Sequence, residues 1–220
     1  MPEALLESIF IAEPPDITYV ITEDETPVDN IFSAKQQRLL VESLYSSWKT
    51  DAPFLAEANV GIFSAIHQPP IVPDLLLSID VQPPDDLWPK ENRSYFLWKY
   101  GKPPEVVMEI VSNAQGGEGD KKLHRYARIG VWYYVVFDPM RIIQQDALRI
   151  YELSIGRYIL KQDRQLTQIG LGLTLWNGVF EGQRAEWLRW RDSEGRLLLT
   201  GAERAERLAA KLRELGVEDA

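Results

Sequence analysis

Cysteine is missing from this sequence of 220 residues, which excludes disulfide bonds, thiol catalysis and zinc sites built on thiolates. Long hydrophobic runs are missing as well, since no stretch reaches the ~18 apolar residues of a membrane-spanning helix. The N-terminus has no basic segment ahead of an apolar one, so we expect no secretory signal. A chain with these absences is typical of the cytoplasm, where thiols stay reduced.

Positive charge is in short supply. The chain has 24 Lys and Arg against 33 Asp and Glu, which gives a net charge of −9 and a pI of about 4.9. Proteins that hold nucleic acid through a broad surface do so by neutralising phosphates, which requires the opposite balance. The composition therefore argues against such a surface, and any positive charge that meets a nucleic acid has to be local.

The residues that are present suffice for a folded core. Hydrophobic residues make up 45% of the chain, and the length fits one large domain or a domain with an appendage. Residues 1–30 are acidic and contain prolines, so we expect an extended arm there with one short strand at Ile17–Ile21. We expect the main domain over residues 31–190 and a helical tail over residues 191–220.

Hydrophobic periodicity predicts an α/β fold for the main domain. The predicted helices are Ser33–Trp48, with Ser33 as N-cap, and Glu118–Ile129, which ends at Gly130. The predicted strands are Leu55–Ile66, Asp74–Val81, Glu105–Val111 and Val131–Phe137, and Tyr95–Tyr100 is either a short helix or an extended segment. Because a strand, a helix and a strand follow one another over residues 105–137, we expect a βαβ unit with a parallel strand pair.

The C-terminal part of the chain gives weaker patterns. We expect a hairpin made of the strands Leu148–Leu153 and Tyr158–Leu160, which are joined through Gly156. We expect only an irregular covering layer over Gly170–Val179 and Trp187–Trp190. Glu203–Leu215 is charged, with a leucine-containing stripe at three-four spacing made of Ala205, Leu208, Leu212 and Leu215. Two heptads are too short for an independent coiled coil, so this helix either docks on its own domain or pairs with a second subunit.

Glu109 is the most informative residue in the sequence, because it interrupts an apolar strand. An ionised carboxylate moved into apolar surroundings costs roughly several kcal/mol unless a partner compensates it. Strand Glu105–Val111 has no hydrophobic–polar alternation, which indicates that both of its faces are covered. Glu109 therefore needs a compensating group, and such acids are often functional.

A second acid and two lysines supply candidates for that group. Asp74 stands at the start of a predicted strand, and it converges with Glu109 if the two strands are neighbours. Lys121 and Lys122 follow in the predicted helix. Two carboxylates suit a hard cation such as Mg²⁺, and a nearby lysine can stabilise the charge that develops on a phosphate during hydrolysis.

Each candidate also has a structural explanation. Asp74 is an ordinary turn residue after a proline, and Lys122 is an ordinary solvated residue of a helix. His67 and His124 have no partners at metal-ligand spacing, and the glycine-rich segment at residues 116–119 lacks the lysine of a phosphate-binding loop. Trp98, Tyr100 and Trp132 could stack on bases, although core packing is the commoner use of such residues.

Several spaced motifs carry a family resemblance. In chain order, the motifs are Pro73-Asp74, Glu109-Ile110-Val111-Ser112, Lys122-Leu123, Tyr126 to Val131 and Tyr134 to Pro139. The pattern resembles the Uma-type putative endonucleases, which belong to the PD-(D/E)XK restriction-endonuclease-like superfamily and are abundant in cyanobacteria. The resemblance covers roughly residues 30 to 190.

The resemblance implies a mixed central sheet flanked by helices, with the acids at its edge and a coiled-coil-like helix behind it. Carried over, Asp74 and Glu109 match the metal-binding acids, and the backbone carbonyl of Ile110 would complete the ligands for Mg²⁺, with Mn²⁺ as an alternative ion. The superfamily's lysine stands two residues after the second acid, where this chain has Val111. The resemblance therefore implies a lysine supplied by the following helix, with Lys122 the best match and Lys121 its competitor.

Two main hypotheses from different classes of function follow, and the first includes DNA as substrate and a second copy of the chain as partner. The first is a Mg²⁺-dependent DNA endonuclease, in which Asp74, Glu109 and Lys122 are the catalytic residues and a homodimer cuts two strands with two sites. The second is a non-catalytic binding or assembly protein on the same fold, which the acidic pI and Val111 favour. A metal-dependent hydrolase with another substrate is a third hypothesis, although nothing in the sequence selects its substrate.

Overall fold

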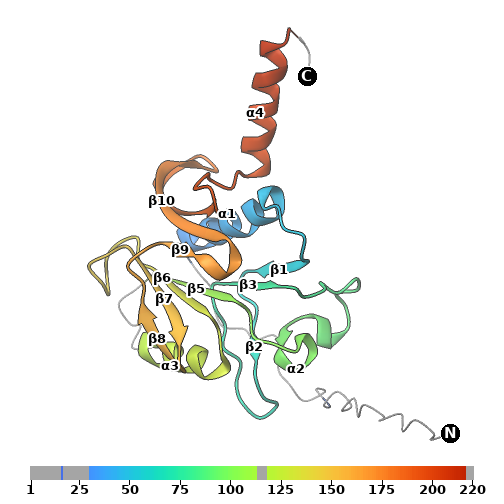
Figure 1. The fold of residues 1–220 in the computed structure, drawn as a ribbon, viewed down its shortest axis with the longest axis vertical. Coiled ribbons are helices and arrows are strands. Elements are labelled where there is room, and N and C mark those ends of the chain that lie inside the picture. The colour runs from blue at the N-terminus through green and yellow to red at the C-terminus, as the bar shows by residue number, and fades with distance from the viewer. Residues whose placement is uncertain (1–15, 17–29, 113–117, 217–220) are drawn as a thin grey trace, which may run out of the picture.

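A six-stranded mixed sheet forms the centre of the computed structural model, which describes residue 16 and residues 30–112 and 118–216. Its strands lie in the order β1-β3-β5-β6-β7-β8 (Figure 1). They comprise β1 Phe54–Glu57, β3 Leu75–Ile79, β5 Val106–Ile110, β6 Tyr133–Phe137, β7 Leu148–Ser154 and β8 Arg157–Leu160. β5 and β6 are parallel, and the other neighbouring pairs are antiparallel. The predicted βαβ unit and the mixed sheet flanked by helices are confirmed.

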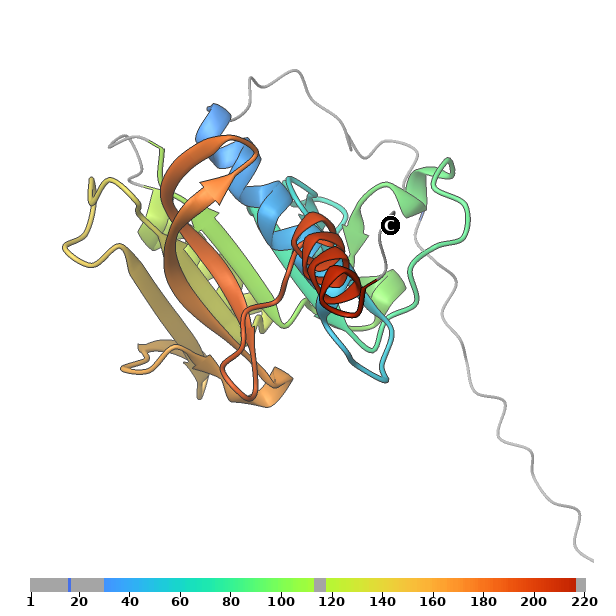
Figure 2. The same cartoon turned by 90° about the horizontal axis from the view of Figure 1, so that it is seen from above.

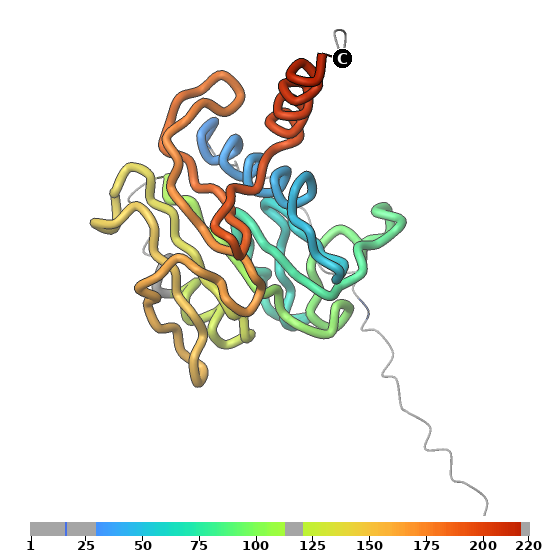
Figure 3. The backbone as a smooth tube through the Cα atoms, turned by 45° about the horizontal axis from the view of Figure 1, so that its top comes forward, coloured from blue at the N-terminus to red at the C-terminus, as the bar shows by residue number. Residues whose placement is uncertain are grey.

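One face of the sheet packs against α1 (Ile31–Ser47) and a long hairpin. Leu40 and Leu44 of α1 are fully buried against the side chains of Leu75 and Met108, which alternate to this face. Figure 3 shows α1 and the hairpin side by side over the sheet. The hairpin consists of β10 Leu171–Phe180 and β11 Gln183–Asp192, and the short β9 (Gln165–Leu166) pairs with β10.

The opposite face packs against α3 (Glu118–Ile129), whose predicted bounds are confirmed. Tyr126 of α3 is fully buried and contacts the sheet through Tyr134, with ring centroids 5.4 Å apart. The helix ends at Gly130, which has a φ of 89° that favours glycine, as predicted. A small parallel pair lies beside this layer, formed by β2 (Ile62–Phe63) and β4 (Tyr95–Phe96), and β4 runs directly into α2 (Leu97–Tyr100). β5 is therefore covered on both faces, as its apolar sequence predicts.

Two sequence predictions are wrong in detail, and a third is untested. Leu55–Ile66 is not one strand, because Asn59 takes a φ of 55° and separates β1 from β2, which belong to different sheets. The N-cap of α1 is Asn30 and not Ser33, since the Asn30 Oδ1 accepts a hydrogen bond of 2.9 Å from the Ser33 backbone N–H. The predicted strand at Ile17–Ile21 lies outside the described residues.

The irregular covering layer predicted for Gly170–Val179 and Trp187–Trp190 is also wrong, because these segments belong to the regular hairpin of β10 and β11. Its turn, Glu181-Gly182, has φ values of 44° and 75°, which suit a tight two-residue hairpin turn. The Glu181 carboxylate binds Lys35 and Arg38 of α1 at 2.9 and 2.6 Å, and these ion pairs hold the turn on the helix. A glutamate at a left-handed position is uncommon, which explains why the sequence did not predict the turn.

α4 (Gly201–Glu214) follows the hairpin and projects from the body of the molecule (Figure 1), and Figure 2 shows it from above, nearly along its axis. The predicted helix in the tail is thus confirmed, while the division of the chain into three parts stays a prediction. Two short 3-10 turns, Lys90–Asn92 and Thr167–Ile169, complete the elements. Within the described residues, no helix is both long enough and apolar enough to cross a membrane.

Candidate metal and phosphodiester site

The register of β3 and β5 brings Asp74 and Glu109 together. The two strands are antiparallel neighbours, with Leu75 opposite Met108 and Leu76 opposite Val107. Asp74 directly precedes β3 and Glu109 directly follows Met108 in β5, so the two acids lie at the same end of this strand pair, close enough for the charge of Asp74 to act on Glu109. The convergence of the two acids, which the sequence analysis made conditional on adjacent strands, follows from the sheet topology.

Asp74 is held by groups from three other parts of the chain. Its Oδ2 accepts a hydrogen bond from the backbone N–H of Ile110, and its Oδ1 accepts one of 3.2 Å from the Gln37 amide of α1. The backbone N–H of Asn59 donates to the Asp74 carbonyl at 3.4 Å. These contacts fix the carboxylate at the open end of the β3–β5 pair.

Glu109 lies under α3, and its side chain is only 14% exposed. Its Oε2 accepts a hydrogen bond of 2.8 Å from the Lys122 ammonium, and its Oε1 accepts one of 2.9 Å from the Tyr126 hydroxyl. Burial raises the pKa of Glu109 to about 7, Lys122 offsets part of that rise, and the negative charge of Asp74 adds to it. The positive charge of Lys122 therefore offsets only part of the rise in the pKa of Glu109.

Lys122 reaches the site, whereas Lys121 is exposed to solvent. Besides Glu109, the Lys122 ammonium donates to the Val72 carbonyl at 3.2 Å. An ammonium has three N–H donors, so a third can point toward a phosphate. Of the two lysines that the sequence analysis considered, Lys122 is therefore the one that contacts Glu109.

The Ile110 carbonyl points toward the same side of β5 as Asp74. The N–H and C=O groups of one strand residue point in the same direction, and the Ile110 N–H donates to Asp74. The next residue, Val111, points the other way and donates its N–H to Phe137 of β6 at 2.8 Å. The carbonyl of Ile110 and the two carboxylates thus lie at one end of the β3–β5 pair.

The donor set fits Mg²⁺ better than a transition metal. Among the described residues, no group of three or more His, Cys, Asp or Glu side chains gathers to hold a metal ion, so a bound ion would have to rely on two carboxylates, backbone oxygen and water. Mg²⁺ is commonly bound by one or two carboxylates and keeps several waters. The raised pKa of Glu109 fits a cation as well, because additional positive charge beside two acids would stabilise their ionised forms.

Sequence reasoning did not assign a role to Gln37, Asn59 or Tyr126. Gln37 is 4% exposed, and its amide exchanges hydrogen bonds with the Asn59 amide at 3.1 and 3.3 Å while it binds Asp74. A buried, polar residue on the inner face of an otherwise apolar helix is the signal that could have identified Gln37. Tyr126 was noted as a motif residue only, and the carboxylate that binds it comes from a distant strand.

The other candidates from the sequence lie elsewhere. Tyr100 stacks on Tyr95, with ring centroids 4.5 Å apart, and Trp98 packs on Phe96 at 5.0 Å, so both have structural contacts. Trp132 is 42% exposed on the connection before β6. None of these three rings belongs to the set of residues around Glu109.

The fold and the site together define a class, namely a mixed α/β protein with a two-carboxylate site that a lysine and a tyrosine complete. The chain belongs to the Uma2 family, described as "Putative restriction endonuclease", which matches residues 13–177. The family resemblance drawn from the motifs is thereby confirmed.

Comparison with solved structures finds similarity to a putative nuclease belonging to DUF820 from Anabaena variabilis, determined by crystallography. The two sequences are 17% identical, the match covers 63% of this chain and 71% of that chain, and the TM-score is 0.44. No curated protein matches the chain.

Proposed function

We propose that this protein is a Mg²⁺-dependent endonuclease that hydrolyses phosphodiester bonds of DNA, with Mn²⁺ as an alternative ion. The observation that carries the proposal is the position of Asp74 and Glu109 at the same end of the adjacent strands β3 and β5, with Lys122 hydrogen-bonded to Glu109. Membership in a family described as restriction endonucleases supports a nuclease in general, and DNA as its substrate.

Asp74, Glu109 and the carbonyl of Ile110 would hold the ion. When bound, Mg²⁺ supplies a Lewis acid for the phosphate and makes a bound water a better nucleophile at neutral pH. Lys122 places an ammonium beside this position, where it neutralises the charge that develops on the phosphate oxygens. Tyr126 donates to Glu109 and fixes the direction of its carboxylate, and Gln37 does the same for Asp74.

The positive charge that DNA requires is local in this acidic chain. α3 carries Lys121, Lys122, Arg125 and Arg128, and the described acidic side chains of the site lie beneath this helix. Arg125 donates to the Pro69 carbonyl at 2.7 Å, which holds that part of the basic surface against the sheet layer. Phosphate contacts from such a surface weaken as salt rises, so cleavage should fall with ionic strength.

Cleavage of supercoiled plasmid in the presence of Mg²⁺ or Mn²⁺ tests the proposal. We expect nicking by the wild type that is abolished by chelation and by the double substitution Asp74→Ala, Glu109→Ala. Lys121→Ala is the matched control for Lys122→Ala, because both residues are lysines of the same helix turn and only one contacts Glu109. Wild-type activity no higher than that of the double variant would falsify the proposal.

A non-catalytic binding or assembly protein is the second candidate, and the net charge of −9 favours it. Calorimetric titration with Mg²⁺ separates the two. Binding that Glu109→Gln abolishes supports the metal site, whereas heat that is unchanged by this substitution favours the non-catalytic protein. The homodimer expected from the sequence remains part of the proposal, because two copies of the site can act on the two strands of a duplex.

A further inference from the structure

α4 leaves apolar surface uncovered. None of its residues is buried, and the exposed fractions are 59% for Leu208 and 78% for Leu215, the residue that directly follows the helix. Figure 1 shows the helix extending away from the sheet and from α1. Isolated helices of about this length are marginal in water, so α4 gains little stability from its own sequence. Its exposed leucines are therefore surface that a partner can cover.

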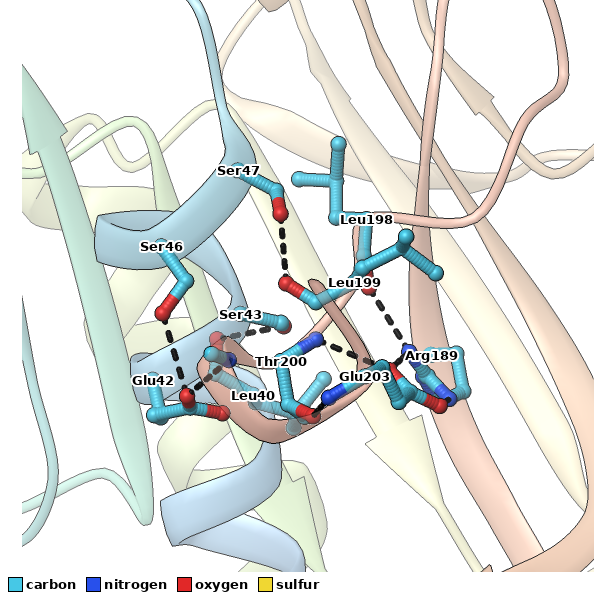
Figure 4. A network of polar contacts seen from close by, with 11 residues as sticks. Leu40, Glu42, Ser43, Ser46, Ser47, Arg189, Leu198, Leu199, Thr200 and Glu203 are labelled. Carbon is cyan, nitrogen blue, oxygen red and sulfur yellow. Dashed lines mark hydrogen bonds and ion pairs between the residues drawn. The ribbon is translucent and has the colours of Figure 1, made fainter. Parts of the chain in front are cut away.

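The base of α4 is nevertheless fixed to the body (Figure 4). Thr200 and Glu203 form a capping box, in which the Thr200 backbone N–H donates to Glu203 at 2.8 Å. Glu203 also binds Arg189 of β11, which is only 1% exposed, at 2.7 Å. Ser47 of α1 donates to the Leu199 carbonyl at 2.5 Å. These bonds set the angle at which the helix leaves the body.

A groove of about 980 Å³ lies between α4, the C-terminal end of α1 and the residues after β11. Its lining contains five Lys and Arg and two acids, both of which bind Arg196. In the described chain, the side chains of Lys49, Arg207 and Lys211 make no hydrogen bond or ion pair. Apolar side chains share the lining, among them Trp48, Leu197 and Leu208. The groove is therefore basic and apolar in a protein that is acidic overall.

The loop after β3 is acidic and apolar, and so complements the basic and apolar groove. Leu87 and Trp88 are 65% and 81% exposed, and Asp85 and Asp86 precede them. The loop is ordered by its own hydrogen bonds, since the Trp88 backbone N–H donates to Asp86 at 2.9 Å and Arg93 donates to the Trp88 carbonyl at 2.9 Å. Because the backbone of the loop is already ordered, presenting Trp88 to a partner costs little backbone entropy on binding.

We propose that loop 82–89 of one copy of this chain occupies the α4 groove of a second copy. Asp85 then faces the unpaired cations, and Trp88 lies against the apolar side chains of the groove. A nucleic-acid phosphate would use the cations but would leave the apolar lining uncovered. Charge and apolar surface together therefore select the second copy as the occupant.

Two-fold symmetry doubles the contact. If each copy inserts its loop into the groove of the other, the interface contains two identical loop–groove contacts. Specific dimers bury about 800 Å² per partner, which one loop of eight residues does not supply alone. The reciprocal arrangement brings both exposed features of each chain into one closed dimer.

Sedimentation equilibrium of the full chain, in chelator and at concentrations from roughly 1 to 100 µM, tests this dimer. We expect a wild-type dimer whose Kd rises about 30-fold or more in Trp88→Ala, the loss typical of a central aromatic anchor. Arg207→Glu alone and Asp85→Arg alone should weaken the dimer, and the double substitution should restore it. Met140→Ala removes an equally exposed apolar side chain elsewhere and should leave the Kd unchanged.

Three results would overturn the proposal. The first is a wild-type monomer across the whole range. The second is a dimer that Trp88→Ala leaves intact and Leu212→Glu dissociates, which would show that α4 pairs with α4. The third is a double variant, Asp85→Arg with Arg207→Glu, that is no tighter than its weaker single variant. All these positions are solvent-accessible, and circular dichroism checks that each variant keeps the fold.

Discussion

Replacing Glu109 by Gln should stabilise the metal-free protein, and the gain should grow with pH. Burial and the charge of Asp74 raise the pKa of Glu109 from 4.5 to about 7. At ~1.4 kcal/mol per unit, ionising this residue in the folded protein costs about 3 kcal/mol. Gln cannot ionise, so it resembles the protonated acid in both shape and charge.

The sign of the effect follows from proton linkage. An acid whose pKa is higher in the folded state binds its proton more tightly there, so its favourable contribution is complete below pH 4.5. That contribution is lost as the pH rises through the folded pKa of about 7. The free energy of unfolding of Glu109→Gln relative to the wild type should therefore increase by about 3 kcal/mol between about pH 4.5 and pH 8.

Urea unfolding at several pH values in chelator measures this difference. Comparing the two proteins at each pH cancels the general effect of net charge, which is the reason for using the difference and not the wild type alone. A difference that stays constant, or that shrinks as pH rises, would refute the electrostatic account of Glu109. Adding Mg²⁺ gives a second readout, because an ion at about 100 times its Kd stabilises the wild type by about 2.7 kcal/mol and should not stabilise the variant.

Three further predictions follow from the contacts. Lys122→Ala should lower plasmid nicking about 100-fold or more, while Lys121→Ala leaves it unchanged, as measured by initial rates. Gln37→Leu should weaken Mg²⁺ binding about 10-fold in calorimetry, because the amide that orients a ligand carboxylate is lost while the buried volume is kept. Glu203→Gln should destabilise the fold by about 3 kcal/mol in urea unfolding, since it leaves the charge of Arg189 buried without its carboxylate, and an unchanged midpoint would contradict this.

The sequence predicted the central part of the fold because its signals there are local. The βαβ unit from β5 to β6 has a continuous apolar strand, an amphipathic helix and a glycine at the helix end, and each signal depends on few residues. The β10–β11 hairpin was missed because its turn is Glu181-Gly182. Glu181 takes a left-handed conformation that ion pairs with α1 compensate, and contacts between distant segments have no local pattern.

The site could be predicted in part for the same reason. Glu109 stands out within an apolar strand, so the sequence indicates it directly, and Asp74 directly precedes a second apolar strand. Gln37 does not stand out, because its importance depends on where α1 crosses the end of β3. The choice between Lys121 and Lys122 likewise depends on how α3 is rotated on the sheet, which the packing of Tyr126 determines.

Because Lys122 is a residue of α3, its ammonium lies beside Glu109 only when α3 is packed on the sheet. A lysine two residues after Glu109 would accompany the acid on the same strand, even in a partly folded chain. Here Glu109 belongs to the sheet and Lys122 belongs to the helix that covers it, so the two groups meet only where α3 is packed on the sheet. Under the proposed mechanism, a chain in which α3 has not yet packed could gather the acids without the lysine, and cleavage would depend on complete folding.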